Sequence, residues 1–482
     1  MFDMLKLLRS KKAISPILAT LLLIMISVAG IVVSYSWIQS FMGNQLSTAS
    51  GFILIENVRW YDSNKIDITI RNSGNVDMII KTLYIDGLGH ELEQSVKPYE
   101  AETITLEYPW NSNQRYKIKI ISNNGLQIEG IYKAPDPSET ITWLTGWNKR
   151  IKITIDKNDV DSELTDFPLL ILLTNKDVSF IFDEVGSNNK KIAIATSDGT
   201  QCYVEIEEWD TNRENALLWV KVPTIKNTTN TNLYLYYDSE HSDNIVYVGD
   251  PDSTPAENVW DNHFKLVSHL NDDPDFSHIR DSTPNDNDGT KEWPNAPIQT
   301  DGKIGKAQEF NRIIGDHVDC GTDSSLDIQY TLTIEAWVNP DSLSTVHQNT
   351  IVDRGASYWF FILNDGTLAF LRFKDGSFGA FGTITTIPTG TFTHVAVTYD
   401  NSALNECKLY INGELSREGS LDGPIHSSAS TVTLGDRSNV HPFDGIIDEV
   451  RISDEVINIA WIKASYESGR DNLVTLGIEE LS

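Results

Sequence analysis

An uncharged apolar stretch near the start of the chain, from Ile14 to Ile38, most constrains what this sequence can form. As a helix it would span about 37 Å at about 1.5 Å per residue, more than the roughly 30 Å hydrocarbon core of a bilayer. Four cations and one acid precede it, and such a cationic flank stays in the cytoplasm. We therefore expect a cytoplasmic leader at 1–13, a transmembrane helix at 14–40, and the bulk of the chain outside the cell. The lipid bilayer is then its first partner.

A cleaved secretory signal peptide is the alternative interpretation of this stretch. Ser27-Val28-Ala29 has the small residues of a cleavage site, but the apolar residues continue well beyond it. The apolar core of a signal peptide, about 7 to 15 residues long, ends sooner. The sequence therefore favours a helix that stays in the membrane.

The segment Lys11-Lys12-Ala13-Ile14-Ser15-Pro16 resembles the N-terminus of archaeal type IV pilins. In that family a basic stretch and a small residue precede a hydrophobe-Ser-Pro triplet and a long apolar helix. The resemblance implies cleavage between Ala13 and Ile14 by a prepilin peptidase, and pilin-like subunits as partners in a filament. A plain anchor that is never processed remains the alternative.

Composition excludes several classes of protein. The 482 residues carry 68 Asp and Glu against 38 Lys and Arg, a formal charge of −30, so nucleic acid is not an expected partner. Three cysteines, Cys202, Cys320 and Cys407, cannot all pair within the chain and form no CxxC element. A disulfide-stapled scaffold and a zinc ribbon are therefore excluded.

The rest of the chain divides into three blocks with strand-like patterns. In the first, 51–134, Ile66, Ile68 and Ile70 alternate with polar residues, which predicts a half-buried strand in a small β-sandwich. The second, 141–250, contains short runs such as ALLWVKVP and NLYLYYDSE, rich in aromatic and β-branched residues. These runs resemble an uncharacterised β-domain family of archaeal and bacterial surface proteins.

The third block, 256–478, contains the runs TLTIEAWVNP, THVAVTYD, CKLYINGELSREG and FDGIIDEVRIS, with hairpin signals such as Asn412-Gly413 between strands. Their order resembles laminin-G-like, concanavalin-A-like domains. The resemblance implies a jelly roll of two antiparallel sheets that binds glycan or protein and is often stabilised by calcium. The expected fold class is thus mainly β: an N-terminal transmembrane α-helix followed by three antiparallel β-sandwich domains, the last a concanavalin-A-like jelly roll.

A structural calcium site is the main candidate for bound chemistry. Strand alternation places Asp448 in an apolar row, where an unpaired carboxylate would cost several kcal/mol. Calcium prefers such oxygens, and the acidic loop at 271–289 supplies more of them. We predict Ca²⁺ bound by Asp281, Asn287 and Asp448. The alternative is a hydrogen-bonded Asp448 beside an ordinary solvated loop. Asn227 begins an N-glycosylation sequon in an outward loop.

No pattern for an enzyme is found. The E-x-D-x-x-E spacing of glycosidases with this fold is absent, as are Gly-x-Ser-x-Gly and HExxH. Glu205 and Glu207 share one face of a strand, which we interpret as solvated. Trp337, Tyr358, Trp359 and Trp461 could stack on sugar rings, although most such aromatic residues lie in the core.

The sequence therefore predicts an archaeal cell-surface protein, membrane-anchored or pilus-associated, whose laminin-G-like domain binds glycan or protein in an adhesin-like role. A purely architectural envelope or filament subunit is the second hypothesis, and a polysaccharide hydrolase is the third.

Overall fold

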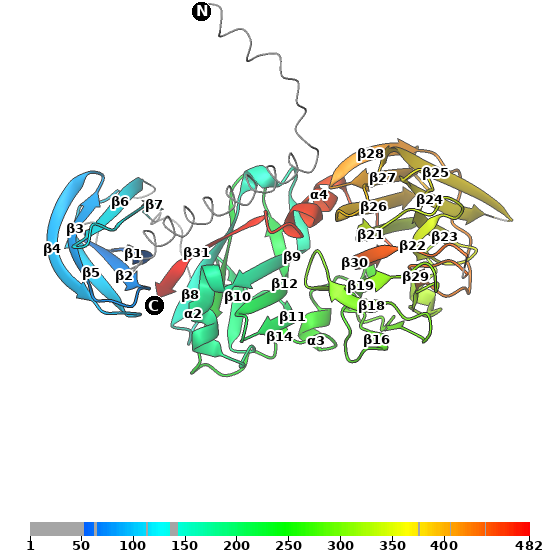
Figure 1. Ribbon diagram of the computed structural model, residues 1–482. Coiled ribbons are helices and arrows are strands. Elements are labelled where there is room, and N and C mark those ends of the chain that lie inside the picture. The colour runs from blue at the N-terminus through cyan, green and yellow to red at the C-terminus, as the bar shows by residue number, and fades with distance from the viewer. Residues whose placement is uncertain are drawn as a thin grey trace, which may run out of the picture. The chain divides into compact units, whose positions relative to one another are not determined.

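The computed structural model describes residues 53–61, 65–111, 114–134, 143–374, 376–404, 406–438 and 440–482 (Figure 1). The chain divides into two compact units, Met1–Ser138 and Glu139–Ser482. Each unit is described by itself.

The described chain is mainly β, as the sequence predicts, but the predicted fold class is wrong in its first element. Across the residues that the structure describes, no helix has the length and apolar character needed to cross a membrane. The helix expected at 14–40 and the cleavage expected between Ala13 and Ile14 both fall outside the described residues.

In the first unit two antiparallel sheets, β1-β2-β5 and β4-β3-β6-β7, contribute to one apolar core. Ile66, Ile68 and Ile70 of β2 are buried in it, so the predicted half-buried strand is confirmed. Asp86 and Gly87 both have positive φ and close the β3–β4 hairpin, because only a left-handed turn matches the strand twist there. The strands are β1 (Ile53–Tyr61), β2 (Lys65–Asn72), β3 (Met78–Ile85), β4 (Leu88–Val96), β5 (Ala101–Glu107), β6 (Arg115–Ser122) and β7 (Gln127–Lys133).

The second unit begins with a middle block of two four-stranded sheets, β10-β13-β8-β31 and β14-β11-β12-β9, packed over a shared apolar core. Helix α2 (Asn175–Val185) contributes to that core. The other elements are β8 (Lys149–Ile155), η2 (Lys157–Asp159), β9 (Leu164–Thr174), β10 (Ile192–Thr196), β11 (Val204–Asp210), β12 (Asn215–Ile225), β13 (Thr231–Tyr237) and β14 (Val248–Gly249).

The part of the chain from β15 to β30, which we call the laminin-G-like block, follows and has two eight-stranded sheets. The first contains β15 (Phe264–Ser268), β18 (Ile298–Asp301), β19 (Lys306–Phe310), β21 (Thr331–Pro340), β26 (Thr393–Asp400), β27 (Cys407–Ile411), β28 (Glu414–Gly419) and β30 (Gly445–Ser453). The second contains β16 (His278–Ile279), β17 (Gly289–Thr290), β20 (Val318–Asp319), β22 (Asn349–Asp353), β23 (Tyr358–Ile362), β24 (Thr367–Lys374), β25 (Ser377–Thr386) and β29 (Thr433–Leu434). Short helices α3 (Thr254–Glu257) and η3 (Ser324–Leu326) lie in the connections.

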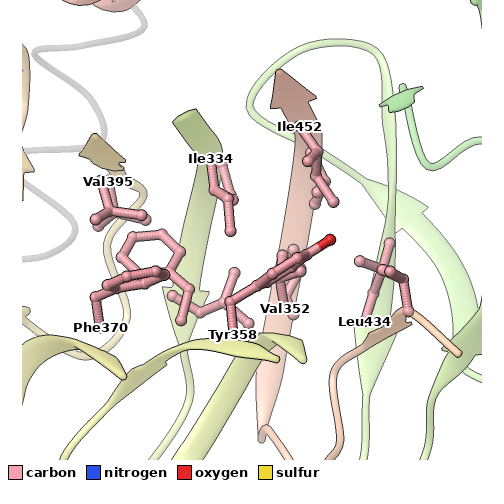
Figure 2. Close-up of a cluster of buried hydrophobic side chains, with 14 of the residues drawn as sticks. Ile334, Val352, Tyr358, Phe370, Val395, Leu434 and Ile452 are labelled. Carbon is pink, nitrogen blue, oxygen red and sulfur yellow. The ribbon is translucent and has the colours of Figure 1, made fainter. Parts of the chain in front are cut away.

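Side chains from both eight-stranded sheets fill the core between them. Figure 2 shows Ile334, Val395 and Ile452 of the first sheet facing Tyr358 and Phe370 of the second. All five are buried, which explains why their strands read as apolar runs in the sequence. Cys202, Cys320 and Cys407 are likewise buried, and they are free.

The chain returns to the middle block at its end. Helix α4 (Ile459–Ser468) packs Ala460 and Ala464 into the middle-block core, and β31 (Val474–Leu481) then pairs antiparallel with β8 (Figure 1). The laminin-G-like block therefore lies between β14 and β31 of the middle block in chain order. The sequence-based boundary at residue 478 cuts through this last strand.

Removing β31 should destabilise the second unit. A chain ending at Leu473 exposes the edge of β8 and loses the packing of Val474 and Leu476, each half-buried and contributing about 1 kcal/mol. We expect the free energy of unfolding to fall by about 2 to 4 kcal/mol, measured by urea denaturation followed by tryptophan fluorescence. A chain ending at Glu480 is the matched control, and equal urea midpoints for both chains would contradict the prediction.

Candidate functional site

The middle block and the laminin-G-like block enclose a set of buried charged side chains, which we call the junction cluster: Glu205, Glu207, His269, Glu449 and Arg451. The prediction that Glu205 and Glu207 face solvent is wrong. Glu205 is 0% exposed and accepts hydrogen bonds from Trp260 Nε1 at 2.7 Å and Ser282 Oγ at 2.6 Å. Apolar contacts between the two blocks, centred on Trp219 and Trp260, cover this face of β11.

His269 lies between the carboxylates of this cluster. Its Nδ1 lies 2.7 Å from Glu449 Oε1 and 3.6 Å from Glu207 Oε2, and its Nε2 lies 3.6 Å from Glu205 Oε2. Trp219 Nε1 donates to Glu207 Oε2 at 2.7 Å. Both nitrogens of the ring therefore face acidic oxygens.

A bulge in β30 brings Glu449 into the cluster. Strict alternation places Glu449 on the face opposite Asp448, but the pairing of β30 with β21 slips by one residue there and Glu449 has a φ of 50°. Such a bulge redirects side chains. Asp448 and Glu449 are consequently both buried, and Arg451 Nη2 donates to Glu449 Oε2 at 2.8 Å.

The electrostatics of the cluster follow from its burial. Burial alone would lower the pKa of His269, but Glu449, Glu207 and Glu205 outweigh this and raise it well above its usual value. Burial raises the pKa of Glu207 to about 7, although the nearby His269 acts in the opposite direction. Burial would also raise the pKa of Glu449, but His269 and Arg451 hold it below its usual value. The cluster is therefore a mutually dependent set of charges.

Asp448 holds the adjacent loop between β18 and β19. Its Oδ2 accepts hydrogen bonds from the backbone N–H of Lys303 at 2.7 Å and of Ile304 at 2.9 Å. A Cβ at Gly302 would lie 2.6 Å from that oxygen, and one at Gly305 would lie 2.7 Å from Glu207 Oε1. Only glycine fits at these two positions, so the loop packs directly against both carboxylates.

The residues of the predicted calcium site are only partly brought together. Asp281 Oδ1 accepts from the N–H of Val267 and Thr283, and its Oδ2 accepts from Thr283 Oγ1 and the N–H of Asn287, all between 2.8 and 3.0 Å. No contact among the described residues joins Asp448 to this pair. Asp281 is thus paired with protein donors, and calcium binding by Asp281, Asn287 and Asp448 stays a prediction.

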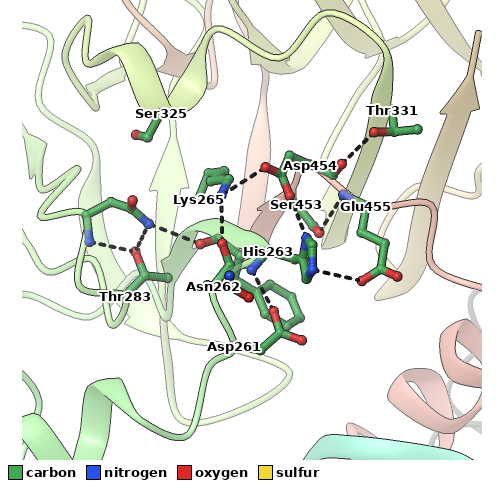
Figure 3. A network of polar contacts seen from close by, with 12 residues as sticks. Asp261, Asn262, His263, Lys265, Thr283, Ser325, Thr331, Ser453, Asp454 and Glu455 are labelled. Carbon is green, nitrogen blue, oxygen red and sulfur yellow. Dashed lines mark hydrogen bonds and ion pairs between the residues drawn. The ribbon is translucent and has the colours of Figure 1, made fainter.

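Two cavities border the junction. One, of about 290 Å³, has Leu170, Leu172 and Leu217 in its wall together with Lys303 and Arg470. The other, of about 180 Å³, lies beside the polar network of Figure 3.

In that network Asp454 accepts from Lys265 Nζ and pairs with His263 Nδ1, both at 2.9 Å (Figure 3). The hydrogen bond to Asp454 raises the pKa of His263. Asp261 Oδ1 accepts from the backbone N–H of His263 at 2.8 Å. These contacts tie the start of β15 to the end of β30, so we interpret the network as structural.

An exposed surface with mixed character lies at one end of the laminin-G-like block. We call residues 292–297 and 311–317 the loop end. Trp293 is 86% exposed and Ile313 is 88% exposed. Asn295 joins the two segments, since its Nδ2 donates to the carbonyl oxygens of Ile314 and Gly315 and its own carbonyl accepts from His317 N–H. No pattern in the sequence distinguishes Trp293 from a core tryptophan.

The other sequence-predicted positions lie elsewhere. Trp337, Tyr358 and Trp359 are buried, so they present no open face to a sugar. Trp461 of α4 packs partly buried against the middle-block core and lines the cavity of about 180 Å³. Asn227 is exposed in the turn between β12 and β13, as its sequon requires.

Two family models match parts of the second unit. Residues 314–463 match the family described as the concanavalin A-like lectin/glucanases superfamily. Residues 188–291 match a domain of unknown function, DUF2341. No curated protein matches the chain.

Among solved structures, the chain is similar to the binding domain of Paraclostridial Mosquitocidal Protein 1, with 19% identity, a TM-score of 0.36, and coverage of 43% of this chain and 52% of that one. It is also similar to domain 4 of AbnA, a GH43 extracellular arabinanase from Geobacillus stearothermophilus, with 25% identity, a TM-score of 0.33, and coverage of 42% and 98%. The chain thus spans about half the length of the first of these. The C-terminal part of this protein contains a concanavalin A-like, laminin-G-like domain.

Proposed function

We propose that this protein binds carbohydrate through its laminin-G-like domain, at the loop end. The family that residues 314–463 match is named after lectins and glucanases. The observation that carries the proposal is Trp293, whose side chain is 86% exposed and offers an apolar face to solvent. Sugar rings stack on such faces, because their C–H faces are apolar while their hydroxyls stay hydrated.

The surroundings of Trp293 suit a polar ligand. Glu292 and Asn311 are exposed in the same two segments, and His317 is half-buried. These side chains provide acceptors and donors in the same two segments as the ring, and such polar groups fix the orientation of a hydroxyl-rich ligand. The loop end is held by backbone contacts, so the ring is presented on an ordered surface.

A protein partner is the second candidate for the same surface. Ile313 and Ile314 are 88% and 49% exposed, and neighbouring apolar side chains left in water are typical of contact surfaces between proteins. A purely architectural role is the third candidate. The location of this protein outside the cell stays a prediction.

Replacing Trp293 tests the proposal. In Trp293→Ala the stacking face is lost, and we expect glycan binding by the full chain to weaken at least about tenfold, equivalent to about 1.4 kcal/mol. The measurement is a glycan array followed by titration of the best glycan.

Tyr330→Ala is the matched control, because Tyr330 is another aromatic residue of the same block and is 62% exposed. Tyr330 directly precedes β21. The loop end lies near the opposite end of that strand, where its Arg312 contacts Ser342 and Asp444. Tyr330→Ala should bind as the unchanged chain does. Equal binding by Trp293→Ala, or no glycan bound by any form, would contradict the proposal. Shortening of a bound polysaccharide during the assay would contradict a binding role without catalysis.

A further inference from the structure

We propose that Glu207, His269 and Glu449 bind a divalent transition-metal ion of the zinc class inside the junction cluster. One ligand atom from each residue can be chosen so that all three lie within 4.8 Å of one another. The three side chains are between 2% and 4% exposed. They come from β11, from the segment after β15 and from the bulge of β30, so both blocks contribute.

The spacing fits a small ion. Zinc binds histidine nitrogen and carboxylate oxygen at about 2.0 to 2.2 Å, which places neighbouring ligands roughly 3 to 3.5 Å apart. His269 Nδ1 lies 2.7 Å from Glu449 Oε1 and 3.6 Å from Glu207 Oε2, so small movements form the site. Calcium suits this set less well, because it prefers six to eight oxygen ligands.

The groups behind the ligands are arranged as outer contacts of a metal site. Trp219 Nε1 donates to Glu207 Oε2, the oxygen that faces His269 Nδ1, and so fixes its direction. Arg451 donates to Glu449 Oε2, which leaves Glu449 Oε1 directed at His269 Nδ1 for a metal. His269 Nε2 is buried without a hydrogen-bond partner and faces Glu205 Oε2 at 3.6 Å. A metal on Nδ1 would leave the ring proton on Nε2, directed at Glu205, as in carboxylate–histidine–metal arrangements.

Formal charge favours a cation in the same place. With the three carboxyl groups of the junction cluster ionised, Glu205, Glu207 and Glu449 contribute −3 and Arg451 contributes +1, and an ionised Asp448 beside them would only make the sum more negative. Even with a protonated His269 the sum is −1, whereas a divalent ion with a neutral His269 gives 0. Because uncompensated charge is costly in a buried site, the ion supplies the charge that the protein residues lack.

The experiment uses the full chain with its natural sequence. After treatment with a chelator and dialysis, the chain is incubated with Zn²⁺ or Ca²⁺, dialysed again, and its metal content is measured by mass spectrometry. We expect about one zinc per chain and no retained calcium at this site. Incubation with Co²⁺ should give the visible absorption of a four-coordinate nitrogen and oxygen site.

Glu207→Gln keeps the shape of the side chain but removes its charge, and we expect zinc affinity to fall at least about 100-fold. Glu208→Gln, the next residue on β11, is the matched control and should keep the zinc. Near-ultraviolet circular dichroism checks that both variants are folded. No zinc retained by the unchanged chain, or equal zinc in the two variants, would overturn the proposal. Trp293→Ala should leave the zinc content unchanged, so this result is separate from glycan binding.

Discussion

The second unit depends on how the two blocks bury charge between them. Glu205, Glu207 and Glu449 are removed from water where the middle block meets the laminin-G-like block, and each is paired with a donor from a tryptophan, His269 or Arg451. A buried charge that loses its partner costs several kcal/mol. The blocks therefore fit together in one arrangement, in which each of these carboxylates has its donor, and sliding one block against the other would separate the carboxylates from those donors.

The apolar contacts around this cluster act in the same direction. Trp219 and Trp260 pack between the blocks and also donate the hydrogen bonds that hold Glu207 and Glu205. The guanidinium of Arg451 lies 4.5 Å from the ring of Trp219, so its charge meets an aromatic face rather than water. Each tryptophan thus contributes both apolar area and a polar contact to the junction.

Local sequence patterns predicted much of the β structure. The alternation of Ile66, Ile68 and Ile70 and the Asn412-Gly413 hairpin were visible because strand period and turn chemistry are local properties. The solvated face expected for Glu205 was wrong, because alternation shows which residues share a face but not what covers that face.

The candidate sites were hard to predict for similar reasons. Glu449 lies in the junction cluster because of a β-bulge, and no residue type in the sequence indicates that bulge. Its contact His269 lies 180 positions earlier in the chain, so no local pattern links the two residues. Trp293 differs from buried tryptophans only in its surroundings. The long-range pairing of β31 with β8 was equally invisible, since a strand pattern does not name its partner.

That pairing sets the route of mechanical load. In the β8–β31 pair, Lys149 lies opposite Leu481 and Ile155 opposite Val474, so the chain enters and leaves the unit at the same end of one strand pair. Tension between the two ends would open these hydrogen bonds one after another, from Leu481 inward. The laminin-G-like block lies outside this path, so a pull would reach it only after the strand pair had come apart.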